Sequence, residues 1–315
     1  MEINERTKPG WFRKAVKTFA KNRTLCLMAL PAVILLFVFN YLPMTGIILA
    51  FKNYRVDKGI FGSDWNGFKN FEFFFTSQEA TIVLRNTILI NLATILLGLF
   101  VSVAIALLMN EIASRVRTRL YQTILFFPYF LSWVVVGYMF YAFLSPQYGM
   151  FNQLIIDLGG EKIQWYSRPQ YWPFILVLAG VWKNMGYSSV IYYSAMMGID
   201  SEYYEAARID GANRFQLVTR ITLPLLKPMI IVNLLLQVGR VLNADFGLFM
   251  FLPKGSPLLH EVTTVIDTYV YNALVSTGDV GIGAATGLFQ SFTGLILLLL
   301  ANWAARKISR EHALF

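Results

Sequence analysis

The stretch EAARIDGANRFQLVTRITLP, residues 205–224, is a charged segment between two long apolar segments of the chain. Glu202 and Glu205 fall in the first turns of a predicted helix, where acidic side chains suit the positive helix N-terminus. Gly211 can supply a left-handed or hinge position without a side-chain penalty. Pro224 re-starts the chain as an apolar helix, because proline is tolerated in a first helical turn. The pattern predicts a bent helical element that lies across a surface.

The composition indicates a membrane protein. The chain has 315 residues, of which 56% are hydrophobic and 14% charged, and its mean hydropathy is +0.53. Such a chain is too apolar to hide its side chains in one soluble core. The net charge of +9 comes from basic residues scattered through the links between apolar runs, so topology explains it better than nucleic-acid binding. One cysteine and two distant histidines exclude a disulfide framework and leave no expected metal site.

Six apolar runs come near the ~20 residues that a helix needs to cross a bilayer. The predicted spans are 24–51, 83–109, 121–144, 172–198, 225–250 and 285–304. The first run is longer than a signal-peptide core and contains Pro31 and Pro43, so we interpret it as an uncleaved span. The sequence therefore predicts an all-α integral membrane protein with six transmembrane helices.

The basic residues predict the orientation of these spans. Sixteen Lys and Arg residues lie in the links assigned to one face and seven in the links assigned to the other. Cytoplasmic links carry the excess of positive charge. We therefore expect a multi-pass protein whose two termini and polar loop 199–224 are all cytoplasmic.

This topology divides the chain into four parts. They are a basic cytoplasmic N-terminus (1–23), a first span with its outer link (24–82), a core of five spans (83–305) that contains the polar loop 199–224, and a cytoplasmic tail (306–315). The outer links are too short to be separate globular domains. A solute-capturing domain, if there is one, must therefore be another polypeptide.

Polar side chains interrupt two of the predicted spans. A charge within a span costs ~2.5–3.5 kcal/mol on insertion scales, so it usually faces protein or water. Lys183 and Tyr187 share one face of the fourth predicted span, another face carries further polar and aromatic groups, and we expect one of these faces to line a cavity. The candidate substrate-pathway residues are Trp182, Lys183, Tyr187, Ser189, Tyr193, Asn233, Gln237, Arg240 and Asn243.

The chemistry of these side chains suits a sugar. Aromatic rings can stack on apolar sugar faces, while hydroxyl, amide and guanidinium groups can bind sugar hydroxyls. In the fifth predicted span, Asn233, Gln237 and Arg240 fall on one helical stripe. The alternative is that these groups pair with one another or with a partner subunit and hold helices together.

Nucleotide binding and catalysis find no support in the motifs. The glycine-rich segment 278–287 fails the dinucleotide-binding spacing, because Thr286 occupies the third glycine position. A GxxxxGK[ST] motif is absent from the sequence. Neither histidine is near a nucleophile and an orienting acid in the sequence. We expect a non-catalytic chain that binds no cofactor.

The polar loop resembles a known family. The EAA signature of permeases in binding-protein-dependent ABC importers reads EAA, three residues, Gly, nine residues and I-x-L-P. The chain matches every element at the right spacing, with Glu205, Ala206, Ala207, Gly211, Ile221, Leu223 and Pro224. The segments NYLPMTGIILAFKNY (40–54), GFKNFEFFF (67–75) and GLFQS (287–291) are similar to the oligosaccharide or polysaccharide subgroup of carbohydrate permeases.

The resemblance implies a type I ABC importer permease fold in which this loop is a cytoplasmic coupling helix, inserted into a cleft of an ATPase subunit. Carried over by position, Glu205 would pair with a basic group there, and Gly211 would allow the bend. The local alternative for Glu205 is a pair with Arg208, worth only ~0.2–0.5 kcal/mol. The implied ATPase-coupling residues are Glu205, Ala206, Ala207, Asp210, Gly211, Ile221, Leu223 and Pro224.

The resemblance further implies a permease subunit that imports an oligosaccharide across a bacterial cytoplasmic membrane. Its partners would be a second, homologous permease in a heterodimer, a cytoplasmic ABC ATPase dimer that binds ATP and Mg, and an extracytoplasmic solute-binding protein. Peptide or amino-acid cargo is the alternative within this class. An ion-coupled secondary transporter is the alternative outside it, and would need ion-coupling groups and usually repeated halves, which are not evident. A membrane-embedded enzyme or scaffold is a third alternative.

Overall fold

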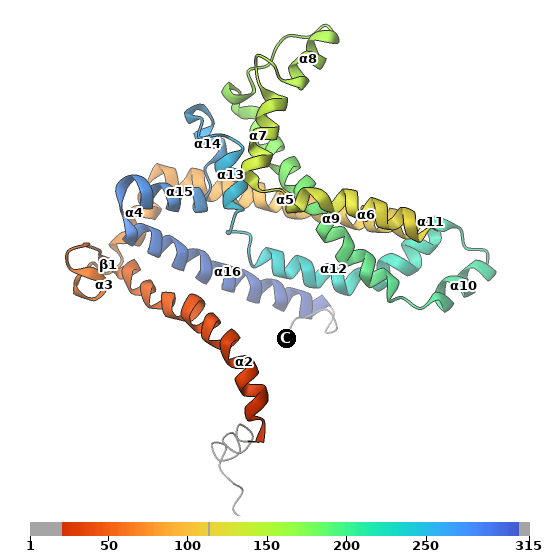
Figure 1. Ribbon diagram of the computed structural model, residues 1–315, viewed down its shortest axis with the longest axis horizontal. Helices are drawn as coiled ribbons and strands as arrows, with labels where there is room; N and C mark the ends of the chain where they lie inside the picture. Colours follow the sequence, from red (N-terminus) through yellow and green to blue (C-terminus); the bar gives the residue numbers. More distant parts are fainter. Residues whose placement is uncertain (1–20, 113, 309–315) are drawn as a thin grey trace, which may run out of the picture.

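The computed structural model of the protein describes residues 21–112 and 114–308, and most of this chain is helical (Figure 1). Residues 1–20 of the predicted basic N-terminus and 309–315 of the predicted tail lie outside the described residues. Five helices are long and apolar enough to cross a membrane: Arg23–Phe51, Gln78–Asn110, Pro169–Met197, Arg214–Val238 and Val280–Lys307. A sixth candidate is a pair of helices, Arg115–Phe130 and Trp133–Leu144, bent by 98°.

The long helices coincide with these candidate membrane spans. The first span joins α2 (Arg23–Leu36) to a π-helical turn (Phe37–Tyr41) and a 3₁₀ segment (Leu42–Phe51). The other long helices are α5 (Gln78–Asn110), α6 (Arg115–Phe130), α7 (Trp133–Leu144), α9 (Trp172–Met197), α12 (Leu223–Val238) and α16 (Val280–Ile308).

Short elements connect the long helices. The short α-helices are α3 (Gly59–Gly62), α4 (Lys69–Thr76), α8 (Met150–Asp157), α10 (Ser201–Ile209), α11 (Arg214–Leu217), α13 (Phe246–Phe251), α14 (His260–Thr263) and α15 (Ile266–Asn272). Two π-helical segments (Val218–Thr222 and Ala273–Thr277) and three 3₁₀ turns (Trp165–Ser167, Pro169–Tyr171 and Pro257–Leu259) complete the helical set. Two short strands, β1 (Lys52–Asn53) and β2 (Asp64–Trp65), pair antiparallel.

The bundle is built around α9. Helices α5 and α6 both pack along it, and α12 lies beside α16 (Figure 1). The main core cluster joins Trp172 and Leu176 of α9 to Val136 of α7 and Leu248 of α13, and these side chains are buried. Within a membrane, such a cluster stabilises the contact between helices through close van der Waals packing. By contrast, α2 extends away from the bundle and buries none of its side chains in this chain (Figure 1).

Two of the predicted spans are not single straight helices, which corrects the sequence analysis. The predicted span 121–144 breaks after Phe130, and Ser132 caps the new helix α7 by accepting a hydrogen bond from the Val135 backbone N–H. Pro128 lies in the last turn of α6, where its missing N–H weakens the helix, and a serine cap favours a restart. Hydropathy measures the length of an apolar run and carries no information about this change of direction.

The predicted span 225–250 is also broken. Helix α12 ends at Val238, and α13 begins at Phe246 with Asp245 as its N-cap. Arg240 therefore lies just beyond the end of the helix, not on a continuous stripe with Asn233 and Gln237 as predicted. Helix α16 approaches the chain closely at this break, since a Cβ added at Gly294 would lie 2.6 Å from the carbonyl oxygen of Gly239.

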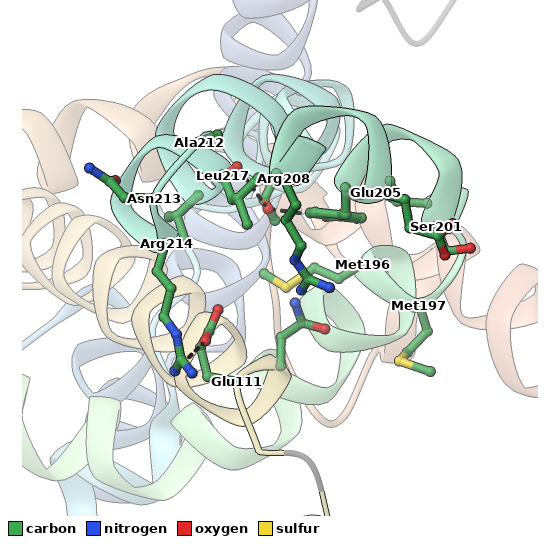
Figure 2. Close-up of a pocket in the computed structure, with 15 residues that line it drawn as sticks. Glu111, Met196, Met197, Ser201, Glu205, Arg208, Ala212, Asn213, Arg214 and Leu217 are labelled. Atoms are coloured by element: carbon green, nitrogen blue, oxygen red, sulfur yellow. Dashed lines mark hydrogen bonds and ion pairs between the residues drawn. The ribbon is translucent and has the colours of Figure 1, made fainter. Parts of the chain in front are cut away.

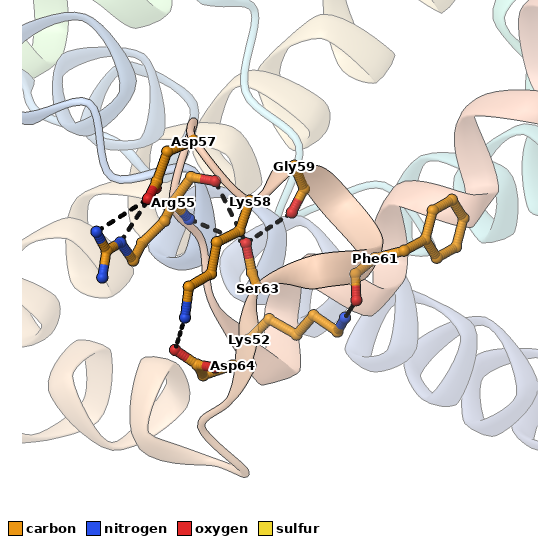
Figure 3. Close-up of polar contacts among 8 residues, drawn as sticks. All are labelled: Lys52, Arg55, Asp57, Lys58, Gly59, Phe61, Ser63 and Asp64. Carbon is orange, nitrogen blue, oxygen red and sulfur yellow. Dashed lines mark hydrogen bonds and ion pairs between the residues drawn. The ribbon is translucent and has the colours of Figure 1, made fainter.

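A small hairpin follows the first span (Figure 3). The Lys52 Nζ is largely buried and donates hydrogen bonds to the carbonyl oxygens of Ile60 (3.1 Å) and Phe61 (2.7 Å), so its charge is solvated by backbone. Lys58 and Asp64 form an exposed ion pair with an N–O distance of 2.7 Å. The hydrogen bond from Lys58 lowers the pKa of the Asp64 carboxyl below its usual value. Polar contacts therefore hold this hairpin together, although aromatic side chains surround it.

Glycine positions test the packing of α6 on α9. Replacing Gly186 by Val should lower the melting temperature of the purified chain in detergent, because the added side chain would collide with the α6 backbone at Leu125. Overpacking in a packed interior costs about 1–3 kcal/mol. Gly287→Ala is the control, since nothing lies within 4 Å of its added methyl group. Equal melting temperatures of the two variants would contradict the described packing.

Candidate functional site

The polar loop folds as the bent helical element that the sequence predicts. The Asp200 side chain caps α10 by accepting a hydrogen bond from the Glu202 N–H at 3.1 Å. The chain then turns at Gly211, whose φ of +83° lies in the left-handed region that favours glycine. Asn213 and Gln216 form a reciprocal capping box at the start of α11, with hydrogen bonds of 2.8 and 2.9 Å. Local side-chain chemistry therefore determines both helix starts and the turn between them.

A cleft of about 930 Å³ opens between this loop and the neighbouring ends of α5 and α9 (Figure 2). Glu205 and Arg208 of α10 line it together with Glu111 and Arg214, and Met196 adds apolar surface. The described residues include no ion pair within 4.0 Å between Glu205 and Arg208. The local alternative considered for Glu205 is therefore not formed, and its carboxylate stays available in the cleft.

One side-chain ion pair attaches the loop to the bundle, and one hydroxyl contact joins the two arms of the loop to each other. The Arg214 guanidinium forms an ion pair with Glu111 at the end of α5, with an N–O distance of 3.1 Å (Figure 2). The Tyr204 hydroxyl lies 3.1 Å from the Thr222 hydroxyl, and Thr222 is buried. An exposed ion pair contributes only about 0–1 kcal/mol. The buried side chains of Leu217 and Thr222 add packing to these polar contacts.

Four of the other implied coupling residues line a separate hollow on the loop. A hollow of about 300 Å³ is lined by Ala207, Asp210, Gly211 and Ile221, together with neighbouring polar side chains. Ala206 is exposed on α10, and Leu223 and Pro224 form the first turn of α12. Residues that are up to 14 positions apart in the sequence are thus brought together by the turn at Gly211.

Exposed apolar side chains on the polar loop were not predicted. The exposed fractions are 60% for Tyr203, 87% for Ile209 and 76% for Phe215. Single exposed apolar residues are common, but three on one short charged loop favour a protein contact, because interfaces enrich aromatic and apolar residues at their centres. The sequence does contain a signal for such a contact, because large apolar residues interrupt a stretch that is otherwise typical of a solvated surface.

The loop continues into the bundle without a break. Helix α11 passes through the π-helical segment Val218–Thr222 directly into α12, and residues Arg214–Val238 form one candidate span. A continuous helix is stiff along its axis because every turn is hydrogen-bonded. The loop is thus connected through a continuous helix to the end of α12 at Val238.

A second cavity, of about 520 Å³, lies among α5, α6, α9 and α12. Four of the candidate pathway residues line it: Tyr187, Asn233, Gln237 and Arg240. We call it the membrane cavity. Tyr129 lines it from the last turn of α6, just before that helix breaks, and Arg240 lines it from just after the end of α12. Non-helical backbone at membrane depth is tolerated only inside protein or beside a water-filled cavity, and both breaks meet that condition here.

The remaining five candidate pathway residues do not line the membrane cavity. Trp182 packs edge to face on Phe140 with ring centroids 6.3 Å apart. Ser189 is buried and donates to the Gly186 carbonyl at 2.8 Å. Tyr193 packs against a buried cluster that contains Met196. Asn243 is exposed in the link after α12, and its backbone N–H donates to the Arg240 carbonyl at 2.9 Å.

Lys183 is held behind the membrane cavity. Its Nζ donates a hydrogen bond of 2.8 Å to the carbonyl oxygen of Tyr129 and lies over the rings of Tyr129 and Trp133 at 5.5 and 5.3 Å. It thus pairs a carbonyl that the break in α6 leaves without a helical partner. Lys183 therefore helps to satisfy the backbone at the break in α6.

Further side chains of the membrane cavity escaped the sequence analysis. Tyr129 stacks on Tyr187 with ring centroids 4.8 Å apart and an angle of 11° between the planes. Asn184 and Ser102 also line the cavity, and the Ser102 hydroxyl is buried without a hydrogen-bond partner among the described residues. The lining face of α9 follows Gly180, Asn184 and Tyr187, whereas the predicted face joined Tyr187 to Lys183, which does not line the cavity. The sequence feature that could have identified Tyr129 is its position directly after Pro128, a residue that weakens a helix.

Side chains from neighbouring helices satisfy the backbone at the second break. The Asn91 amide of α5 donates to the Val241 carbonyl at 2.7 Å, and the Gln290 amide of α16 donates to the Leu242 carbonyl at 2.9 Å. The Asp267 carboxylate accepts from the Ala244 N–H at 2.8 Å. Burial raises the pKa of Asp267, an effect that the hydrogen bond from Ala244 opposes. The break between α12 and α13 is therefore a built feature of the fold.

Comparison with known proteins places this architecture in a family. Residues 94–310 match the family described as binding-protein-dependent transport system inner membrane component. The polygalacturonan/rhamnogalacturonan transport system permease protein YteP of Bacillus subtilis is 35% identical over 92% of this chain and 90% of its own length. The trehalose/maltose transport system permease protein MalF of Thermococcus litoralis is 28% identical over 83% of this chain and 86% of its own length.

Solved structures agree with the sequence relatives. A chain of a bacterial alginate ABC transporter, in complex with a periplasmic protein bound to an alginate pentasaccharide, has a TM-score of 0.84 and 32% identity. The alignment covers 93% of this chain and 98% of that one. The family match covers more than half of the chain, and the signature, the helical architecture and the structural likeness agree with it. This chain therefore belongs to the binding-protein-dependent transport system inner membrane components, the permeases of ABC importers.

Proposed function

We propose that this chain is the permease subunit of an ATP-driven importer that moves an oligosaccharide into the cytoplasm. The observation that carries the proposal is the complete EAA signature, folded as an exposed bent loop and continuous with the helix that reaches the membrane cavity. Carbohydrate cargo is supported by relatives that include permeases for polygalacturonan/rhamnogalacturonan, trehalose/maltose and arabinooligosaccharides.

The proposed assembly assigns the chemistry to other chains. A cytoplasmic ABC ATPase dimer binds ATP and Mg, a second homologous permease completes a heterodimer, and an extracytoplasmic solute-binding protein delivers the sugar. This chain catalyses no reaction and binds no nucleotide. In this assembly both termini and the polar loop are cytoplasmic, which agrees with the distribution of Lys and Arg. The division into a first span and a core of five spans carrying the loop 199–224 is part of the same proposal.

The proposed mechanism couples the loop to the membrane cavity. Glu205 pairs with a basic group of the ATPase, Ala206 and Ala207 allow close approach, and Gly211 sets the bend. Closure of the ATPase dimer displaces α10 and α11, and α12 transmits that displacement to its end at Val238. The cavity side chains on α12 then move relative to Tyr187 on α9. Substrate access alternates because binding of ATP favours one arrangement of the bundle over the other.

Charge reversal at Glu205 tests the proposed docking contact. In the complex assembled with its ATPase, Glu205→Lys should reduce sugar-stimulated ATP hydrolysis at least about tenfold, equivalent to ~1.4 kcal/mol. Glu202→Lys is the control, because Glu202 is an exposed acid on the same helix that does not line the cleft. Sugar-stimulated hydrolysis that persists in Glu205→Lys, or that falls equally in both variants, would contradict a specific role for Glu205.

The backbone at Gly211 provides an independent test of the bend. Gly211→Val should uncouple ATP hydrolysis from transport, since a β-branched residue is strongly disfavoured at φ +83°. Gly211→Asn should retain most coupling, because asparagine tolerates the left-handed region. Nothing lies within 4 Å of a Cβ at this position, so the two variants differ in backbone preference and not in steric contact. Transport by Gly211→Val at the wild-type rate would show that the bend is dispensable.

A further inference from the structure

We infer that the membrane cavity selects sugars that carry a carboxylate, and that Arg240 is the residue that recognises it. The inference rests on the proposed import function and names the class of substrate. Three features of the cavity support it: the positive charge of Arg240 among neutral lining residues, the location of Arg240 at a helix break, and the polar groups around the rest of the cavity.

Arg240 brings an uncompensated positive charge to the cavity. Its side chain is exposed and forms no ion pair or hydrogen bond with any described residue. Every other residue that lines the cavity is neutral. A charge at membrane depth is costly unless it faces water or a partner. The cavity therefore offers an anion a favourable site, and it offers a neutral sugar no equivalent gain.

The nearest carboxylates along the chain are occupied elsewhere. Asp245 accepts a hydrogen bond of 2.7 Å from the Trp133 indole N–H and a second from the Gly247 N–H at 3.1 Å. Asp267 accepts from the Ala244 N–H and lies 3.5 Å from the Gln290 amide nitrogen. Both carboxylates close the break between α12 and α13 and neither lines the cavity. A ligand carboxylate would thus meet Arg240 without competition from these groups.

The guanidinium group suits this task. Its planar donor fork binds a carboxylate through two parallel hydrogen bonds, which a lysine ammonium cannot reproduce. Arg240 follows the end of α12. It therefore projects from the link beyond Val238 and not from the helix itself. The competing role for this cation is to offset the negative end of the α12 dipole. Lysine would serve that competing role equally well.

The rest of the cavity fits the body of a sugar. The Asn184 and Asn233 amide nitrogens donate to the Gly180 and Met229 carbonyls of their own helices, at 3.0 and 3.1 Å. Their amide oxygens remain as acceptors for sugar hydroxyls. The buried Ser102 hydroxyl has no partner among the described residues, so a ligand hydroxyl or water would satisfy it. The stacked pair of Tyr129 and Tyr187 offers an aromatic surface for an apolar sugar face.

Matched sugars test the inference directly. The assembled permease and ATPase complex, in detergent and without its binding protein, is titrated with radiolabelled galacturonate trimer and with the same trimer after reduction of its carboxyl groups. The wild-type complex should bind the acidic trimer at least about tenfold more tightly, equivalent to ~1.4 kcal/mol. Arg240→Gln should abolish this preference and leave binding of the neutral trimer within about twofold, while Arg240→Lys should retain part of it.

A control variant and a second readout separate the outcomes. Lys254→Gln also removes one positive charge, but Lys254 lies over the rings of Tyr138 and Tyr141 outside the cavity, so the preference should persist. Equal wild-type affinity for both trimers would overturn charge selection and leave oligosaccharide import standing. If Arg240→Gln weakened binding of both trimers equally, the role of Arg240 would be to stabilise the end of α12. Binding of neither trimer, together with no uptake of either in proteoliposomes containing the binding protein, would overturn the proposed function as well.

Discussion

The structure depends on the requirement that backbone polar groups at membrane depth find partners. Two helices break within the bundle, and each break is closed by side chains from another helix. Lys183 pairs the carbonyl of Tyr129, while Asn91 and Gln290 pair carbonyls beyond the end of α12. Several polar residues in the apolar spans are therefore structural. Those left over, with Arg240 foremost, line the membrane cavity that the breaks help to create.

The same breaks connect the two candidate sites. The polar loop runs through α11 and the π-helical segment into α12, and α12 ends beside the membrane cavity. Thus one continuous helix links a surface where apolar side chains such as Ile209 are exposed to a cavity where Arg240 is unpaired. The ion pair between Arg214 and Glu111 that attaches the loop to α5 is exposed, and an exposed pair of this kind contributes only about 0–1 kcal/mol.

The sequence predicts the local features well and the tertiary ones poorly. The acidic first turn of α10, the turn at Gly211 and the family signature depend on residues close in sequence, so these features of the polar loop could be predicted, whereas the capping box of Asn213 and Gln216 was not. The break after Phe130 was missed because hydropathy does not record direction. The lining face of α9 was also missed, since the rotation of that helix depends on the contact of Gly186 with α6. Lys183 illustrates the limit, because its partner is 54 residues away.

Cross-linking from the exposed tip of the polar loop tests whether this loop docks on an ATPase subunit. Cys26 is the single cysteine, so Cys26→Ala provides a clean background for Ile209→Cys, at a position that is 87% exposed. In the assembled complex, we expect a covalent link between this cysteine and the ATPase subunit, with a yield that changes when ATP binds. A cysteine at Tyr148, which is 90% exposed on the link between α7 and α8, should form no such link. Absence of the ATPase adduct at position 209, or equal yields at both positions, would contradict the account.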